Sequence, residues 1–131
     1  MGTVSVGAIS GLLLGATTSF LITGRLFHPF QARTPATWRT ESWRQHVLAL
    51  LLHMIAGASL GLLFMLSGSP SFDWTLAKLM AAAWAAIASC LLMHALYVNW
   101  HAGFVIGILI DWAVFVGGVL LACAWFRAST A

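Results

Sequence analysis

Four long apolar segments make up most of this chain, and they limit how it can fold. They lie at residues 4–23, 46–67, 76–98 and 103–126. Each is long enough to cross the ~30 Å hydrocarbon core of a bilayer as a helix. Because lipid offers no hydrogen-bond partners, the backbone N–H and C=O groups must be satisfied inside each helix. The pattern therefore predicts an all-α integral membrane protein with four transmembrane helices, in one domain that covers residues 1–131.

The composition supports this class and excludes others. The 131 residues are 61% hydrophobic and 7% charged, whereas soluble domains carry about 25% charged residues. The net charge of +3 is small and scattered along the chain, so no nucleic acid partner is predicted. The two cysteines fall in different apolar segments and form no C-x-x-C motif, so a redox dithiol is not predicted either. The predicted environment is the lipid bilayer.

The connections between the segments predict how the helices are arranged. A turn at 67–71 and a tight connection at 99–102 favour antiparallel neighbours, which gives an up-down-up-down four-helix bundle. The first connection is longer. Its His-Pro pair at 28–29 predicts the end of the first helix, because the residue before proline avoids helical geometry. After a Thr-Pro pair at 34–35, a short interfacial helix is expected over residues 35–45.

Basic residues predict the orientation in the membrane. The first connection, residues 24–45, contains four arginines, whereas the opposite side of the bundle has only Lys78 and Arg127. Loops rich in Lys and Arg stay in the cytoplasm. We therefore expect a multi-pass protein of the cell membrane, with residues 24–45 in the cytoplasm and both termini outside.

Small residues recur at every fourth position in each segment, and each run includes a polar or sulfur-containing residue. The runs are Gly7, Gly11, Gly15 and Ser19; His53, Gly57 and Gly61; Ala82, Ala86, Cys90 and His94; and Gly103, Gly107 and Asp111. Residues four apart share one helix face, and small residues let helices approach closely in lipid. The runs therefore predict helix-packing faces that keep their polar members away from lipid. We also expect the bundle to be a homo-oligomer.

The polar members of these runs fall at similar depths. With ~1.5 Å of rise per residue, His53, His94 and Asp111 lie about 6–12 Å inside one membrane boundary. The Thr17, Thr18 and Ser19 turn lies at a similar depth. Ionisable groups in lipid are costly, so such a cluster is a hypothesis for a functional site. We predict that these six residues line one polar cavity, with His53 and Asp111 as direct neighbours.

The chemistry of this cluster leaves several alternatives open. A His53–Asp111 pair would serve as a structural clasp. A histidine that changes charge near neutral pH would let the cluster respond to protons or to a small ligand, in a binding or transport module. His53 and His94 would suit haem, or zinc together with Asp111, in a redox protein. An accessory subunit of a larger complex is a further alternative. A hydrolase triad from Ser19 or Ser89 lacks an elbow motif.

Overall fold

The computed structural model describes residues 2–31, 43–68, 71–97 and 100–131, and these residues form helices and no strand. The elements are α1 (Thr3–Thr18), the π-helix η1 (Ser19–Phe27), α2 (His28–Gln31), α3 (Trp43–Leu66), α4 (Trp74–Tyr97) and α5 (Ala102–Thr130). Four continuous helices are long and apolar enough to span a membrane, and the first of them runs from Thr3 to Gln31. The predictions of an all-helical chain and of four membrane-length helices are confirmed.

The first helix is longer than the sequence predicts. It does not end at the His-Pro pair but continues to Gln31, so that prediction is wrong. Pro29 follows the π-helical segment directly and lies in the last turn of this continuous helix. The side chain of Gln31 is fully buried, and its Oε1 accepts a hydrogen bond from the His101 backbone N–H at 3.0 Å, which holds this end against the start of α5. The expected interfacial helix falls largely on residues 32–42, outside the described residues.

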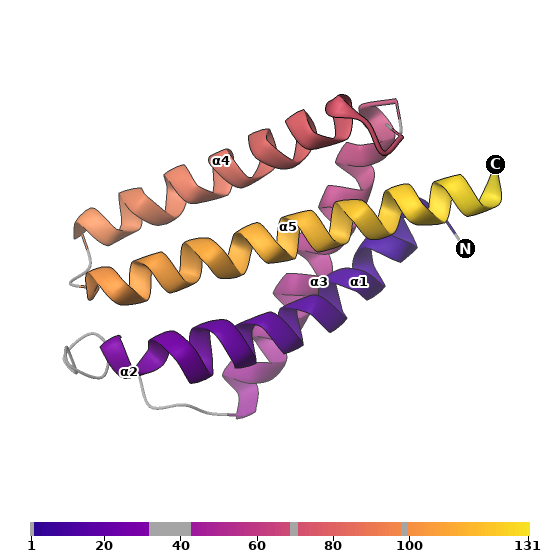
Figure 1. The fold of residues 1–131 in the computed structure, drawn as a ribbon. Coiled ribbons are helices and arrows are strands. Elements are labelled where there is room, and N and C mark those ends of the chain that lie inside the picture. The colour runs from indigo at the N-terminus through magenta and orange to yellow at the C-terminus, as the bar shows by residue number, and fades with distance from the viewer. Residues whose placement is uncertain (1, 32–42, 69–70, 98–99) are drawn as a thin grey trace.

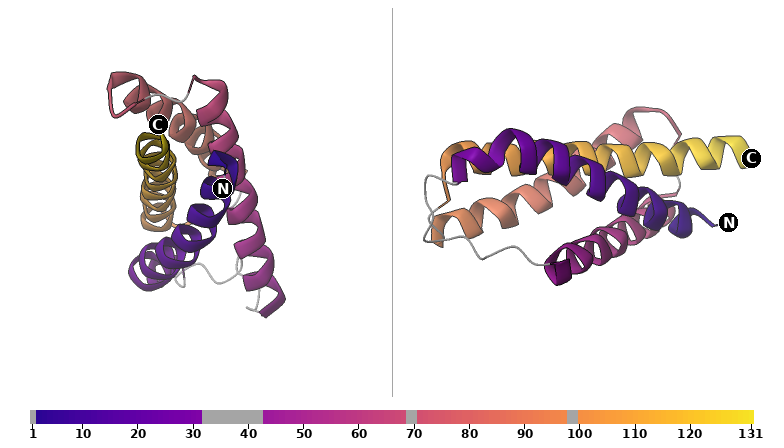
Figure 2. Two further views of the ribbon diagram at one scale, coloured as in Figure 1. Left: turned by 90° about the vertical axis from the view of Figure 1, so that its right-hand side faces the viewer. Right: turned by 90° about the horizontal axis from the view of Figure 1, so that it is seen from below.

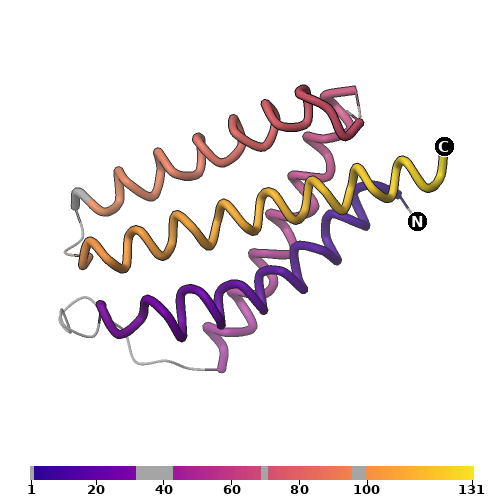
Figure 3. The backbone as a smooth tube through the Cα atoms, viewed as in Figure 1, coloured from indigo at the N-terminus to yellow at the C-terminus, as the bar shows by residue number. Residues whose placement is uncertain are grey.

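The α5 helix is the central element of the bundle. It contacts the first helix, α3 and α4, whereas α4 packs chiefly against α5. Figure 1 shows the first helix, α5 and α4 in a row, with α3 crossing behind, and Figure 2 gives the same arrangement from two other sides. The two termini lie at the same end of the molecule, as the tube in Figure 3 makes clear. A hydrogen bond joins α4 to α5, from Trp84 Nε1 to the Leu109 carbonyl oxygen at 3.0 Å.

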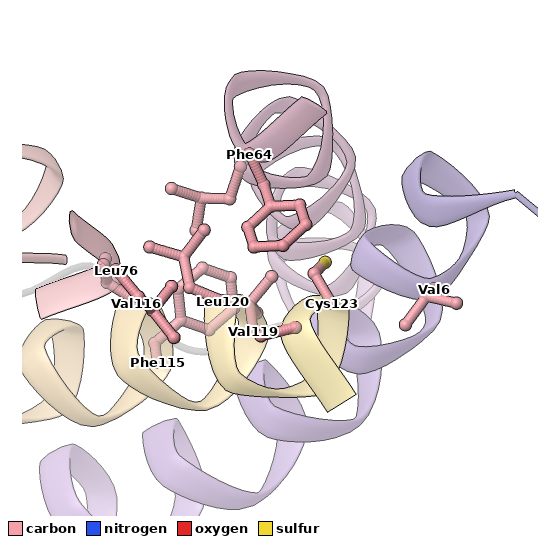
Figure 4. Close-up of a cluster of buried hydrophobic side chains, with 10 residues drawn as sticks. Val6, Phe64, Leu76, Phe115, Val116, Val119, Leu120 and Cys123 are labelled. Carbon is pink, nitrogen blue, oxygen red and sulfur yellow. The ribbon is translucent and has the colours of Figure 1, made fainter. Parts of the chain in front are cut away.

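The hydrophobic core lies around the C-terminal half of α5, near the end of the molecule that holds both termini (Figure 4). Side chains from α1, α3 and α4 meet those of α5 there. The labelled members are Val6, Phe64, Leu76, Phe115, Val116, Val119, Leu120 and Cys123. In lipid, such contacts act through close packing rather than through the hydrophobic effect. The core therefore holds one end of the bundle together, while α3 diverges from the first helix toward the other end (Figures 1 and 2).

Glycine backbones meet where α1 crosses α3. A Cβ atom added to Gly11 would lie 2.8 Å from the Gly57 Cα atom, and one added to Gly61 would lie 2.9 Å from the Thr3 carbonyl oxygen. A Cβ atom added to Gly7 or to Gly57 would come even closer to the carbonyl oxygen of the other glycine. Because Cβ atoms do not approach other atoms this closely, the crossing has no room for any side chain. The spacing of four places these glycines on one face of each helix.

The other two runs of small residues have different surroundings. Gly107 and Gly103 of α5 lie against the Phe27 and Phe30 side chains of the first helix. The run on α4, in contrast, is exposed rather than on a packing face inside the chain, which differs from the sequence expectation. Its members are Ala82, Ala86, Cys90 and His94. The reason is that α4 contacts the core with another face, which carries Leu76, Met80 and Ala83.

Candidate functional site

A buried carboxylate on α5 forms the centre of the candidate site. The Asp111 side chain is only 6% exposed. Its Oδ2 atom accepts hydrogen bonds from Thr23 Oγ1 at 2.7 Å and from Ser19 Oγ at 3.3 Å. Its Oδ1 atom has no hydrogen-bond partner among the described residues. Both donors belong to η1, so this π-helical segment supplies the polar groups that replace water around the carboxylate.

His53 of α3 completes a chain of three side chains. Its Nε2 atom lies 3.4 Å from Ser19 Oγ, and its Nδ1 atom lies 2.7 Å from the Ala49 carbonyl oxygen. The ring fills the space that the missing side chain of Gly15 leaves. It also stacks on Trp112, with the ring centres 5.6 Å apart. Packing thus fixes the ring with Nδ1 toward a carbonyl oxygen and Nε2 toward the serine.

One proton decides whether all the hydrogen bonds among His53, Ser19 and Asp111 can form. Because Nδ1 faces a carbonyl oxygen, it acts as a donor, and Nε2 of a neutral ring is then an acceptor. The Ser19 hydroxyl has one proton and would face two acceptors, His53 Nε2 and Asp111 Oδ2. With a second ring proton on Nε2, His53 donates to Ser19 and Ser19 donates to Asp111, so each contact is satisfied. The arrangement therefore suits a centre that takes up a proton.

The structure brings Ser19, His53 and Asp111 together, but with a difference from the sequence expectation. Within the described chain no ion pair joins His53 to Asp111, and the Ser19 hydroxyl contacts both instead. Thr18 is buried, and its hydroxyl has no partner among the residues described. Thr17 is exposed and bonds to carbonyl oxygens of its own helix. Neither Thr17 nor Thr18 therefore takes part in the hydrogen bonds of the centre.

His94 also differs from the sequence expectation. It is exposed on α4, and its Nδ1 atom lies 2.8 Å from the Cys90 carbonyl oxygen of the same helix. The side chain of His53, in contrast, points from α3 toward Gly15 and Ser19 of the first helix. The structure therefore does not bring the two histidines to one cavity. Within the described ranges, no group of three His, Cys, Asp or Glu side chains is placed to hold a metal ion.

Thr23 is the functional residue that the sequence reasoning missed. It makes the shortest hydrogen bond to Asp111. A signal for it was present, because the spacing of four that links Gly7, Gly11, Gly15 and Ser19 continues to this residue. The predicted end of the first segment coincided with Thr23, so the run was not extended to it.

A pocket of about 640 Å³ adjoins the centre. Its walls come from residues 15–28 of the first helix and 46–53 of α3, and α4 and α5 contribute none of its lining. One wall is polar and consists of Ser19, Thr23 and His53. The apolar lining residues are Ala16, Phe20, Ala49 and Leu50. The basic residues lie toward the connection between the two helices and are Arg25, His28 and His46. Two residues of the pocket wall, Ser19 and Thr23, thus also bind the Asp111 carboxylate.

Comparison with known proteins gives no assignment: no family model matches the chain, and no curated protein or solved structure matches it either.

Proposed function

We propose that this protein is a small binding or transport module of the membrane, in which His53, Ser19 and Asp111 form a proton-responsive centre. One observation carries the proposal. The Ser19 hydroxyl is within hydrogen-bond distance of both the imidazole Nε2 and the carboxylate Oδ2. An imidazole, a hydroxyl and a carboxylate in this order can hold or release one proton with small movements of hydrogen atoms.

The pocket provides a binding site for a ligand directly beside the proton-responsive centre. Ser19, Thr23 and His53 line the pocket and also belong to, or contact, the hydrogen-bonded chain. A molecule in the pocket therefore changes the surroundings of the proton site directly. Because linkage is reciprocal, proton uptake then changes the affinity for that molecule by the same factor. This coupling is what a proton-responsive binding or transport module requires.

The placement in the membrane belongs to the same proposal. We infer an up-down-up-down bundle in the cell membrane, with residues 24–45 in the cytoplasm and both termini outside. The arginines of that connection and the common end of the two termini (Figure 1) support this orientation. We also infer self-association through α4, because its exposed face carries the run of small residues that suits close helix packing in lipid.

Trp112 provides the test of the proton-responsive centre. Its indole stacks on the His53 ring, and a protonated imidazole quenches indole emission more strongly than a neutral one. We expect a reversible loss of tryptophan fluorescence when the pH is lowered and His53 takes up a proton. The change should disappear in His53→Gln and in Trp112→Phe, but remain in His94→Gln, since His94 is exposed and lies outside the centre.

The same measurement separates the proposal from a purely structural clasp. If His53→Gln destabilises the protein but leaves the pH dependence of the fluorescence unchanged, the centre only holds the helices together. Circular dichroism over the same pH range controls for unfolding, which would change the emission of all seven tryptophans.

A further inference from the structure

Among the described residues, the lining of the pocket comes from two of the four long helices. Its lining comes from the first helix and the N-terminal part of α3, with no contribution from α4 or α5. The first helix and α3 diverge toward this end of the molecule (Figures 1 and 2). On the side that none of the described helices lines, the proposed membrane placement puts the acyl chains of lipids. A ligand there must tolerate hydrocarbon on one side.

The charge of the pocket lining sets a second requirement for a ligand. The exposed Arg25 guanidinium lines the pocket beside His28 and His46, and no acidic side chain is among the described lining residues. Of the three acidic residues in the chain, Asp73 lies before α4, and Glu41 is outside the described residues. The third, Asp111, does not line the pocket and binds Ser19 and Thr23. The charge of the described lining therefore attracts an anion.

The apolar part of the lining distinguishes a lipid from a soluble anion. Phe20 is 64% exposed and lines the pocket together with Ala16 and Leu50. A small hydrophilic anion bound at Arg25 would leave this surface and the open side to hydrocarbon. An acyl chain attached to the anion would cover both. An anionic head with an apolar chain thus fits both halves of the lining.

We propose that the pocket binds one anionic phospholipid from the leaflet next to residues 24–45. Its phosphate lies at Arg25, and one acyl chain follows Phe20 and Leu50 toward His53. The proposal names the ligand class for the pocket beside the proton-responsive centre, and it rests on the proposed function for the membrane placement. Anionic lipids are abundant in the cytoplasmic leaflet, where basic residues at the surface attract them.

The test is native mass spectrometry of the full chain taken from bilayers that contain phosphatidylglycerol and phosphatidylcholine. We expect one phosphatidylglycerol to be retained per chain in preference to phosphatidylcholine. Arg25→Gln should lower this retention about fivefold, which corresponds to about 1 kcal/mol per basic residue near the surface. Arg127→Gln is the matched control, since Arg127 is an exposed arginine near the other end of the bundle and should leave retention unchanged.

A second variant tests the pocket without a change of charge. Ala49→Trp places a large side chain in the lining and should also reduce retention of phosphatidylglycerol. Three results would overturn the proposal. Equal retention of the two lipids would mean that the protein carries only surrounding lipid, and full displacement by glycerol phosphate would mean that the ligand is a soluble anion. A lipid-free dimer would mean that a second copy of the chain covers the pocket. The fluorescence titration of Trp112 needs no anionic lipid, so failure of one proposal can be told from failure of the other.

Discussion

Asp111 shows how a single carboxylate can be kept in an apolar bundle. An unpaired charge in lipid is costly, and such residues are normally paired or hydrogen-bonded inside the protein. Here Oδ2 takes two hydroxyl donors from one helical segment, and Thr23 provides the shorter bond. The Ser19 hydroxyl is shared with His53, whereas the Thr23 hydroxyl bonds to Asp111. Thr23 should therefore stabilise the site, and Ser19 should connect its two ionisable groups.

This difference predicts the effect of removing the Thr23 hydroxyl. Thr23→Val should lower the free energy of unfolding by about 1–3 kcal/mol, because a buried acceptor loses its best donor. Thr17→Val is the same chemical change on the same helix, at an exposed residue that bonds only to carbonyl oxygens of its own helix. It should change stability by less than about 0.5 kcal/mol. Reversible unfolding in detergent measures both, and equal effects would show that the bond to Asp111 contributes nothing.

Sequence reasoning found part of this site for reasons that can be traced to single residues. Depth and the spacing of four placed Ser19, His53 and Asp111 at one level, and they lie together. The same reasoning included His94, which is exposed on α4. Depth along a helix does not determine which face of that helix meets its neighbours. That choice comes from the packing of α4 on α5, and a single sequence carries little information about it.

At the scale of elements, η1 gives the first helix its face toward Asp111. In an α-helix, residues four apart drift by about 40° per step, because there are 3.6 residues per turn. A run of small and polar residues from Gly7 to Thr23 would therefore wind away from one face. In η1 the hydrogen bonds span five residues, as from the His28 N–H to the Thr23 carbonyl oxygen, so each residue turns less. The π-helical segment thus offsets the drift between Ser19 and Thr23.

The end of the first helix was mispredicted at this same scale. Proline disfavours a helix when its missing N–H breaks a bond to the preceding turn. Here the helix continues through Pro29 to Gln31, directly after the π-helical segment ends at Phe27. The bond between Gln31 and His101 cannot be inferred from local sequence, because it joins residues far apart in the chain.

The crossing of α1 and α3 predicts unequal effects of two alanine substitutions. Gly57→Ala should destabilise the protein by about 1–3 kcal/mol, because its Cβ would meet the backbones of Gly7 and Gly11. Gly117→Ala is the matched change on α5, where the nearest atom is the flexible end of Met80 at 3.2 Å. It should be neutral or stabilise the helix by up to about 1 kcal/mol. If unfolding measurements give the same result for both, close backbone approach does not determine the stability of this crossing.

At the scale of the whole molecule, the packed end and the open end have different roles in the proposed orientation. The core lies near the termini, and the polar centre and its pocket lie toward the arginine-rich connection. Access from the cytoplasmic leaflet therefore requires that residues 24–45 face the cytoplasm. Arg33→Cys should react with a membrane-impermeant thiol reagent only in inverted vesicles, and Ser129→Cys only in intact cells. Both are made in a Cys90→Ser, Cys123→Ala background, and the opposite pattern would invert the orientation.

The unequal burial of the helices predicts an interface between copies of the chain. In an apolar stretch of 18 residues within each helix, 44% of α5 is buried inside the molecule, compared with 11% of α4. Cys90 is an exposed free cysteine in the run of small residues on α4. If this face joins two copies, mild oxidation in liposomes should give a disulfide-linked dimer through Cys90. Cys90→Ser should abolish it, whereas Cys123→Ala should not, because Cys123 is buried in the core. A true interface keeps its cross-linking yield when the protein is diluted with lipid. A yield that falls in proportion to dilution would mean random collision, and α4 would then face lipid alone.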